Sequence, residues 1–211
     1  MSAYYNLKAI ILKRQDFRED DLLIAVYSKE KGKAILQAKG AKKILSKLAG
    51  HLEPVTLSYL NITYGKQIDQ LIGAQIIKSY AKIKSDIQLT AYAYYFIELI
   101  DRLTKEDHAD QNIFQLLEKS LDFLNANQGE LKIARISFGY KLLHFLGFNP
   151  AQKEKLKNGI EYIIKNNIKN IIKNNQINQN LVELNKILDQ ELENNLETAI
   201  KTKEFLRCLK S

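Results

Sequence analysis

Cysteine is almost absent from the 211-residue sequence, which contains a single one, Cys208. One thiol cannot form an intramolecular disulfide, and it excludes a zinc site built mainly from thiolates. No apolar run approaches the roughly 18 residues that a membrane-spanning helix requires. Residues 1–6 also lack the charged-then-apolar pattern of a secretory signal. We therefore expect a soluble cytoplasmic protein with no membrane association and no structural metal.

Acidic residues are scarce in the first part of the chain. Residues 1–84 hold 15 Lys and Arg against 7 Asp and Glu, whereas residues 85–211 hold 17 against 17. The whole formal excess of +8 therefore lies in the first two-fifths of the sequence. Concentrated positive charge indicates a polyanionic partner, with nucleic acid the first candidate, although lysine-rich surfaces also serve solubility alone.

The apolar pattern of the first 80 residues is short and typical of strands. Apolar residues alternate from Tyr5 to Ile11, and Leu22 to Tyr27 is a continuous run. The five predicted strands span about residues 5–11, 22–27, 33–38, 55–64 and 68–77. Five strands with no long helix between them indicate a small closed barrel or sandwich, and the five-stranded OB-fold barrel fits best.

The period becomes helical from residue 86 onward. One stripe runs from Leu89 to Leu103, a second from Ile113 to Leu124, and a third helix is expected over Leu131–Leu146, ending at Gly147. Closing helices are expected from Leu181. The sequence thus predicts an α+β protein with an OB-fold domain over residues 1–80 and an all-helical domain over residues 81–211.

Asparagine and isoleucine dominate residues 158–180, an insert in the helical part with 8 Asn and 7 Ile among 23 positions. The isoleucines can form a helical stripe, but asparagine is a poor helix former. A frayed helix and a hairpin both stay open for this segment.

The most informative stretch is the basic loop that follows the third predicted strand. It is flanked by Gly40 and Gly50 and carries four lysines within nine residues: Lys39, Lys42, Lys43 and Lys47. Lys13, Arg14 and Arg18 follow the first strand and can extend the same surface. Such a cluster beside a barrel is an electrostatic funnel for a phosphate backbone, and the alternative is a solvated loop with no ligand.

Several segments occur in an order and spacing that resemble the bacterial RecO family of DNA repair and recombination mediators. The resemblance covers about residues 4–150 and the last turn or two. The segments are Lys8-Ala-Ile-Ile-Leu-Lys-Arg-Gln-Asp-Phe, Ala38-Lys-Gly-Ala-Lys-Lys, Leu48-Ala-Gly-His-Leu-Glu-Pro, Leu142-Leu-His-Phe-Leu-Gly-Phe-Asn-Pro and Lys201-Thr-Lys-Glu-Phe-Leu.

The resemblance implies a non-enzymatic protein that binds single- and double-stranded DNA and anneals complementary strands. It also implies work with RecR, in the RecF pathway, to load RecA onto strands covered by single-strand-binding protein. By the matched motifs, Lys39, Lys42 and Lys43 lie where the family's loop meets DNA, with Lys13, Arg14 and Lys47 as further candidates nearby.

The sequence departs from the family in its helical part. Many members carry a four-cysteine zinc site after the segment that ends at Pro150, and no cysteine follows here until Cys208. Zinc is therefore not expected. The family also holds the acidic C-terminal tail of single-strand-binding protein in this part, and Arg135 and Lys141 are the matching candidates. Gly139 stands where a glutamate is usual.

Other reactive side chains show no catalytic pattern. The three histidines lack partners at metal-ligand spacing, and the sequence contains no Walker-type loop, nucleophile elbow or paired catalytic carboxylates. Glu19-Asp20-Asp21 is interpreted as a hairpin charge cluster. Tyr27 and Tyr64 either stack on bases or pack in the core.

We therefore expect a nucleoid-associated recombination mediator with no enzymatic activity and no cofactor. The alternative is a protein–protein adaptor whose basic barrel binds an acidic protein partner instead of DNA.

Overall fold

The computed structural model describes residues 4–44, 46, 48–126, 129–148, 156–196 and 200–208. The chain forms two compact units, Met1–Ala81 with Ile97–Glu118 and Lys82–Phe96 with Lys119–Ser211. Among the described residues, no helix is long and apolar enough to span a membrane. The predicted domain division into 1–80 and 81–211 concerns independent folding and stays a prediction.

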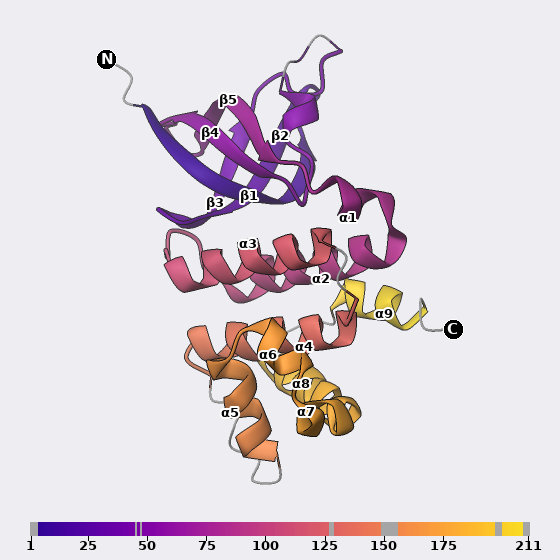
Figure 1. Ribbon diagram of the computed structural model, residues 1–211. Coiled ribbons are helices and arrows are strands. Elements are labelled where there is room, and N and C mark those ends of the chain that lie inside the picture. The colour runs from indigo at the N-terminus through magenta and orange to yellow at the C-terminus, as the bar shows by residue number, and fades with distance from the viewer. Residues whose placement is uncertain are drawn as a thin grey trace. The chain divides into compact units, whose positions relative to one another are not determined.

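The first unit contains a closed five-stranded barrel (Figure 1). Its strands are β1 (Tyr4–Phe17), β2 (Asp21–Ser28), β3 (Gly32–Ala38), β4 (Leu57–Thr63) and β5 (Asp69–Lys78), and a 3-10 turn η1 (Ala49–His51) precedes β4. The order around the barrel is β1-β2-β3-β5-β4, and only β3 and β5 pair in parallel. This arrangement confirms the predicted OB-fold class.

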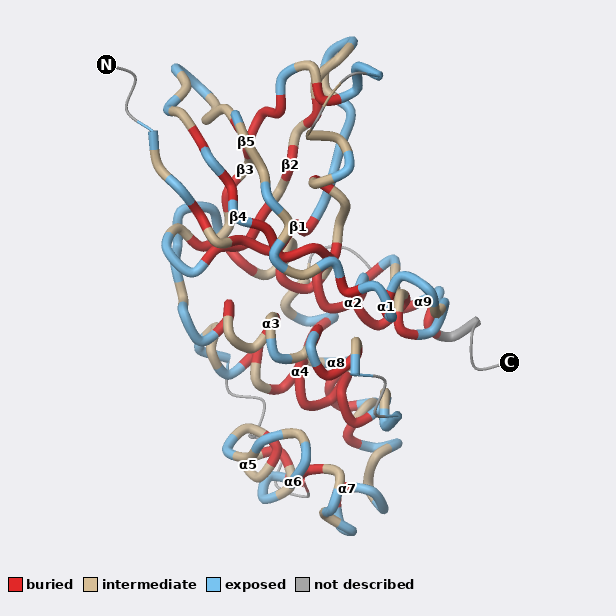
Figure 2. The backbone as a smooth tube through the Cα atoms, turned by 45° about the horizontal axis from the view of Figure 1, so that its top comes forward, coloured by how far each residue is buried: buried red, intermediate tan, exposed pale blue. Residues whose placement is uncertain are grey.

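Strand β1 closes the barrel because it pairs on both sides. Residues 4–10 pair with β4 and residues 9–17 pair with β2, with a bulge between Ile11 and Lys13. Alternate side chains of each strand point inward, so β2 contributes Leu22, Ile24 and Val26 to the core. Figure 2 shows buried stretches within the barrel strands. Ala41 and Leu52, from the connection between β3 and β4, belong to the same buried cluster.

Helices make up the rest of the described chain. Their bounds are α1 (Ala81–Ser85), α2 (Ile87–Leu103), α3 (Gln111–Asn125), α4 (Leu131–Phe145), α5 (Lys157–Lys165), α6 (Ile168–Ile172), α7 (Asn175–Gln179), α8 (Leu181–Asn195) and α9 (Lys201–Cys208). The Asp86 carboxylate accepts hydrogen bonds from the backbone N–H groups of Gln88 and Leu89 and so caps α2. The predicted helical stripes and the stop at Gly147, whose φ is 83°, are confirmed.

The asparagine-rich insert folds into the three short helices α5, α6 and α7. Asn167 caps α6 by accepting from the Asn170 N–H, and Asn174 caps α7 by accepting from the Ile177 N–H. The insert's buried side chains include Ile160, Ile163, Ile171 and Ile177. Asparagine disfavours helix interiors but is among the best N-cap residues, which explains why the segment is helical in short pieces.

Gly32, at the start of β3, allows a close backbone approach within the first unit. Its φ is +71°, and a Cβ atom at this position would lie 2.1 Å from the carbonyl oxygen of His108. The segment between α2 and α3 therefore rests directly on the β2–β3 hairpin.

Gly32→Ala is expected to destabilise the protein strongly, because it combines left-handed backbone strain with a clash against backbone atoms. Gly147→Ala is the matched control, since Gly147 has φ +83° and open space around its Cβ position. Strain alone costs about 1–2 kcal/mol, and overpacking adds about 1–3 kcal/mol. Denaturant unfolding measures both variants, and equal losses would show that the contact with His108 is absent.

Candidate nucleic-acid interface

The turn that follows β3 is held in place by the carboxylate of Asp21. One oxygen accepts from the Gln37 side-chain amide at 2.7 Å and the other from the Gly40 backbone N–H at 2.8 Å. The Lys42 N–H also donates to the Asp20 carbonyl at 2.9 Å. These bonds fix the exposed Lys39, Lys42 and Lys43 beside the turn between β1 and β2, whereas Lys47 lies outside the described residues.

Most basic side chains of this turn face a carboxylate. Lys42 forms an ion pair with Asp16 at 3.1 Å, and Lys43 forms one with Asp20 at 3.6 Å. Arg14, at the exposed end of β1, is paired with Glu53. Exposed pairs of this kind contribute about 0–1 kcal/mol, so a phosphate can replace the carboxylate at small cost.

Three cations near this turn form no ion pair within the described part of the chain: Lys13, Arg18 and Lys39. Arg18 lies over the ring of Phe17, with 5.0 Å between the guanidinium carbon and the ring centroid. The Gly40 hydrogen bond is the main cause of the lowered pKa of Asp21, and the charges of Arg18 and Lys39 add to it. The charges of Arg18 and Lys39 therefore both favour the ionised form of one carboxylate.

The strand register places apolar side chains next to these cations. Because Leu22, Ile24, Leu36 and Ala38 point into the core, the alternate residues point out of the barrel. We define the outer face of β1–β2–β3 by these outward residues: Lys13, Gln15, Phe17, Leu23, Ala25, Ile35 and Gln37. Lys13 pairs with Ala25, and Leu23 pairs with Gln37. Leu23, Ala25 and Ile35 are half-buried, so apolar surface remains accessible there.

Four other barrel lysines are occupied by carboxylates from residues 97–118. Lys33 pairs with Asp101 at 3.0 Å and Lys31 with Asp107 at 3.4 Å. Glu118 pairs with both Lys8 and Lys78, at 3.1 and 3.5 Å. The compact unit that contains both sets holds 15 Lys and Arg against 13 Asp and Glu, a difference of only +2. The charge excess of the barrel residues is therefore largely balanced within the first unit.

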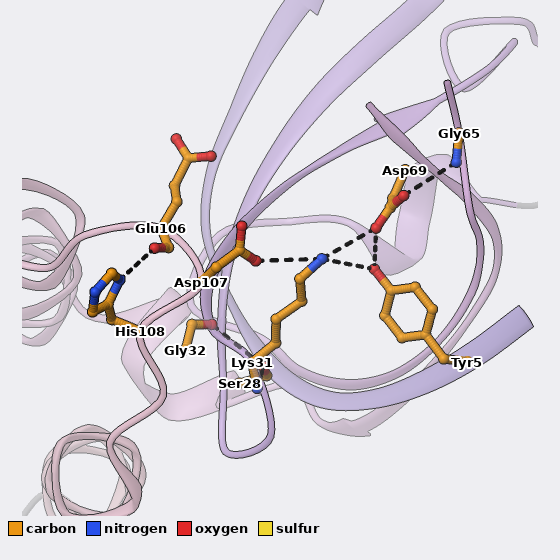
Figure 3. Close-up of polar contacts among 9 residues, drawn as sticks. All are labelled: Tyr5, Ser28, Lys31, Gly32, Gly65, Asp69, Glu106, Asp107 and His108. Atoms are coloured by element: carbon orange, nitrogen blue, oxygen red, sulfur yellow. Dashed lines mark hydrogen bonds and ion pairs between the residues drawn. The ribbon is translucent and has the colours of Figure 1, made fainter. Parts of the chain in front are cut away.

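Lys31 forms the densest of these contacts (Figure 3). Its ammonium group lies 3.2 Å from Asp69 and 3.4 Å from the Tyr5 hydroxyl, which donates to Asp69 at 2.5 Å. Burial and the bond to Asp69 raise the pKa of Tyr5 to about 12. Burial opposes ionisation of Asp69, but hydrogen bonds from Tyr5 and Gly65 and the charge of Lys31 lower its pKa. Lys31 therefore stays charged and keeps its contacts with Asp69 and Tyr5.

The two candidate stacking tyrosines have different surroundings. Tyr27 is fully buried, so the interpretation as a core residue holds and the stacking role is excluded in this structure. Tyr64 is 60% exposed and packs against Tyr5, with 4.9 Å between the ring centroids. Tyr64 therefore lies beside the contacts between Lys31 and Tyr5, and it follows β4, which is not part of the outer face.

Arg135 and Lys141 lie on α4 in the second unit. Arg135 is buried, donates to Asn185 at 2.5 Å and pairs with Asp189, and its guanidinium lies over the Tyr95 ring. The Lys141 ammonium donates to the Asn166 carbonyl at 2.6 Å. Burial, together with the charge of Lys119, lowers the pKa of Lys141. Both side chains hold the helical unit together, and their role as partner contacts stays a prediction.

Metal-ligating side chains do not converge in the described ranges, where no group of three or more His, Cys, Asp or Glu residues is placed to hold an ion. Within the acidic cluster, Asp21 binds backbone and amide N–H groups and Asp20 pairs with Lys43.

Family models match both parts of the chain. The model described as "Recombination protein O N terminal" matches residues 1–80, and "Recombination protein O C terminal" matches residues 84–161. The chain belongs to the recombination protein O family. The family resemblance predicted from the motifs is thereby confirmed.

Curated relatives carry the name DNA repair protein RecO. The chain is 34% identical over 146 residues to the protein from Desulforamulus reducens, which is 69% of this chain and 56% of the relative. It is 33% identical over 150 residues to that of Dehalococcoides mccartyi, covering 71% and 59% of the two chains. For Bacillus mycoides the identity is 30% over 147 residues, covering 70% and 59%. The matched region is therefore under two thirds of each relative's length.

The candidate interface contains residues that motif reasoning did not single out. Leu23 and Ile35 belong to strands predicted from the sequence, but their outward direction follows only once the inward set is known. The alternation Leu22–Leu23–Ile24 gives no signal, because all three side chains are apolar. The role of Asp21 likewise depends on the approach of Gly40, which is distant in sequence.

Asp21→Ala is expected to release the turn at residues 39–43, and Glu19→Ala is the control with the same change of charge. Amide hydrogen exchange at Gly40 should accelerate about tenfold in Asp21→Ala and stay unchanged in Glu19→Ala. Because the pKa of Asp21 is lowered in the fold, the tether is complete above the ordinary aspartate pKa and is lost as the pH falls through the lowered value. Unchanged exchange in Asp21→Ala would contradict the tether.

Proposed function

We propose that this chain is a DNA repair and recombination mediator that binds single- and double-stranded DNA and anneals complementary strands. With RecR and single-strand-binding protein, it promotes RecA loading in the cytoplasm, at the nucleoid. The observation that carries the proposal is the outer face on a RecO-family barrel, where Lys13, Arg18 and Lys39 flank half-exposed apolar side chains. Membership of a family whose relatives are named DNA repair proteins supports it.

The mechanism is electrostatic neutralisation combined with sequence-independent base contact. Lys13, Arg18 and Lys39 bind phosphates and release counterions, and Lys42 and Lys43 exchange their carboxylate partners for phosphates. Leu23, Ile35 and Phe17 offer apolar surface to bases, which is tolerant of sequence. Two strands held in this way repel each other less, so their pairing is faster. This role is binding and needs no catalytic group or cofactor.

Contact with the tail of single-strand-binding protein is assigned to the second unit. There the exposed Lys132 of α4 lines a cavity of about 310 Å³ together with Leu131, Leu181 and Leu206. Lysine beside apolar side chains suits an acidic, phenylalanine-ending peptide. On this proposal, Arg135 contacts the tail only after the tail displaces Asp189 from the Arg135 guanidinium.

Lys13→Gln with Lys39→Gln is expected to lower the salt dependence of single-strand binding. Each lost phosphate contact removes about 0.7 from the log–log slope, so the double variant loses about 1.4. Lys42→Gln with Lys43→Gln is expected to lose less, because Asp16 and Asp20 already compete with phosphate there. Fluorescence anisotropy of a labelled oligonucleotide across salt concentrations measures the slopes.

Lys29→Gln with Lys66→Gln is the matched control, since both lysines are exposed on barrel turns outside the outer face. Its slope should equal that of the unaltered protein. An unchanged slope in the Lys13 and Lys39 variant, with the fold intact, would place the DNA elsewhere.

Annealing of two complementary labelled strands tests the mediator role. The protein should accelerate pairing of bare strands and of strands covered by single-strand-binding protein, and salt should reduce both rates. Acceleration of bare strands alone would contradict the assigned tail contact. Absence of annealing and of DNA binding, with retained affinity for acidic peptides, would favour the adaptor.

A further inference from the structure

The hairpin end of β2 and β3 is enclosed by an acidic segment of the same compact unit. Residues 101–110 carry four carboxylates, on Asp101, Glu106, Asp107 and Asp110, against two cations, Arg102 and Lys105. The Asp107 N–H donates to the Lys33 carbonyl at 2.9 Å, and Lys33 bridges to Glu106 in parallel. The segment thus continues the sheet at the edge of β3 that β5 leaves unpaired, since β5 pairs only with Leu36 and Gln37.

The same segment covers outward-facing side chains of the hairpin. Lys33 points outward by register, and its ammonium group is bound by the carboxylate and the carbonyl of Asp101. Tyr27 pairs with Lys33 across the two strands and is fully buried. Burial and the nearby charge of Asp110 raise the pKa of Tyr27 to about 12. The outer face that remains accessible therefore ends at the pair Ala25 and Ile35.

From these contacts we infer that the acidic segment sets the length of the DNA track. A strand bound along Lys39, Leu23, Ile35 and Lys13 meets carboxylates at the hairpin end. Lys31 is already bound there by Asp107 and Asp69 (Figure 3), and Lys33 is bound by Asp101. Repulsion from Glu106 and Asp107 stops the phosphate backbone there. This inference rests on the proposed function and assigns Glu106 and Asp107 as the residues that limit the bound length.

Glu106 and Asp107 are suited to a charge test because their side chains are exposed. The Asp107 side chain is 66% exposed, and its bond to Lys33 uses the backbone, which a substitution leaves in place. Asp110 is left unchanged, because its carboxylate caps α3 through the Asn112 N–H at 2.7 Å. Lys31 keeps its contact with Asp69 when Asp107 is neutralised.

Glu106→Gln with Asp107→Asn is expected to extend the track by about one phosphate contact, at Lys31, because its ammonium group then has one carboxylate partner, Asp69, in place of two. The slope of log affinity against log salt should steepen by about 0.7, which corresponds to about fivefold tighter binding at 0.1 M salt. The occluded length on poly(dT) should also increase. The control, Glu161→Gln with Glu204→Gln, changes the net charge equally, at one half-exposed and one exposed position of the helical unit, and should leave slope and length unaltered.

Lys31→Gln completes the test. In the unaltered protein it should leave the slope unchanged, whereas in the Glu106→Gln and Asp107→Asn background it should abolish the gain. Asp107→Asn alone is the reserve variant if the double variant does not fold, as judged by circular dichroism. A double variant whose slope and occluded length equal those of the charge control overturns the inference.

Failure of the inference is separable from failure of the proposed function. If Lys13→Gln with Lys39→Gln weakens binding but the carboxylate variants match their control, the track exists and the acidic segment does not limit it. If the unaltered protein does not bind DNA, both the proposed function and this inference are overturned.

Discussion

Ion pairs between barrel lysines and the carboxylates of residues 97–118 decide where this protein can receive a polyanion. Lys8, Lys31, Lys33 and Lys78 are bound within the first unit by Asp101, Asp107 and Glu118, and Lys31 also by the less exposed Asp69, so a phosphate must displace a carboxylate to reach them. The cations left without such partners include Arg18 and Lys39, near the opposite end of β2 and β3, and Lys13, which pairs with Ala25 in the middle of β2. The lysines at the hairpin end are thus paired with carboxylates, and the outer face is more positive toward the turn after β3.

At the turn after β3, contacts with a carboxylate likewise fix where the cations lie. A single carboxylate, Asp21, accepts from the side chain of Gln37 and the backbone of Gly40, and the charges of Arg18 and Lys39 help to lower its pKa. The turn is therefore a positioned element of the barrel, although it is exposed and basic. Lys42 and Lys43 sit on it with carboxylate partners that a phosphate can replace.

The barrel and the helices could be predicted from the sequence, but the pairing of lysines with carboxylates could not. Strand alternation and helical stripes arise from local burial, so the barrel, the helices and the stop at Gly147 were predictable. The partners of Lys31 and Lys33 lie about 70 residues farther along the chain, and no local pattern reveals such pairs. The helical caps Asn167 and Asn174 show a related limit, because composition alone does not separate a cap from a helix interior. The burial of Tyr27 likewise depends on a distant segment.

Amide chemical-shift mapping with a short single-stranded oligonucleotide locates the bound strand on the barrel. The largest changes are expected at Lys13, Leu23, Ile35 and Lys39, and they should stop before Lys31 and Lys33. Largest changes on the exposed β4–β5 residues Tyr59, Ile72 and Ile77 would contradict it, because that surface carries none of the three cations left without an ion pair near the β3 turn.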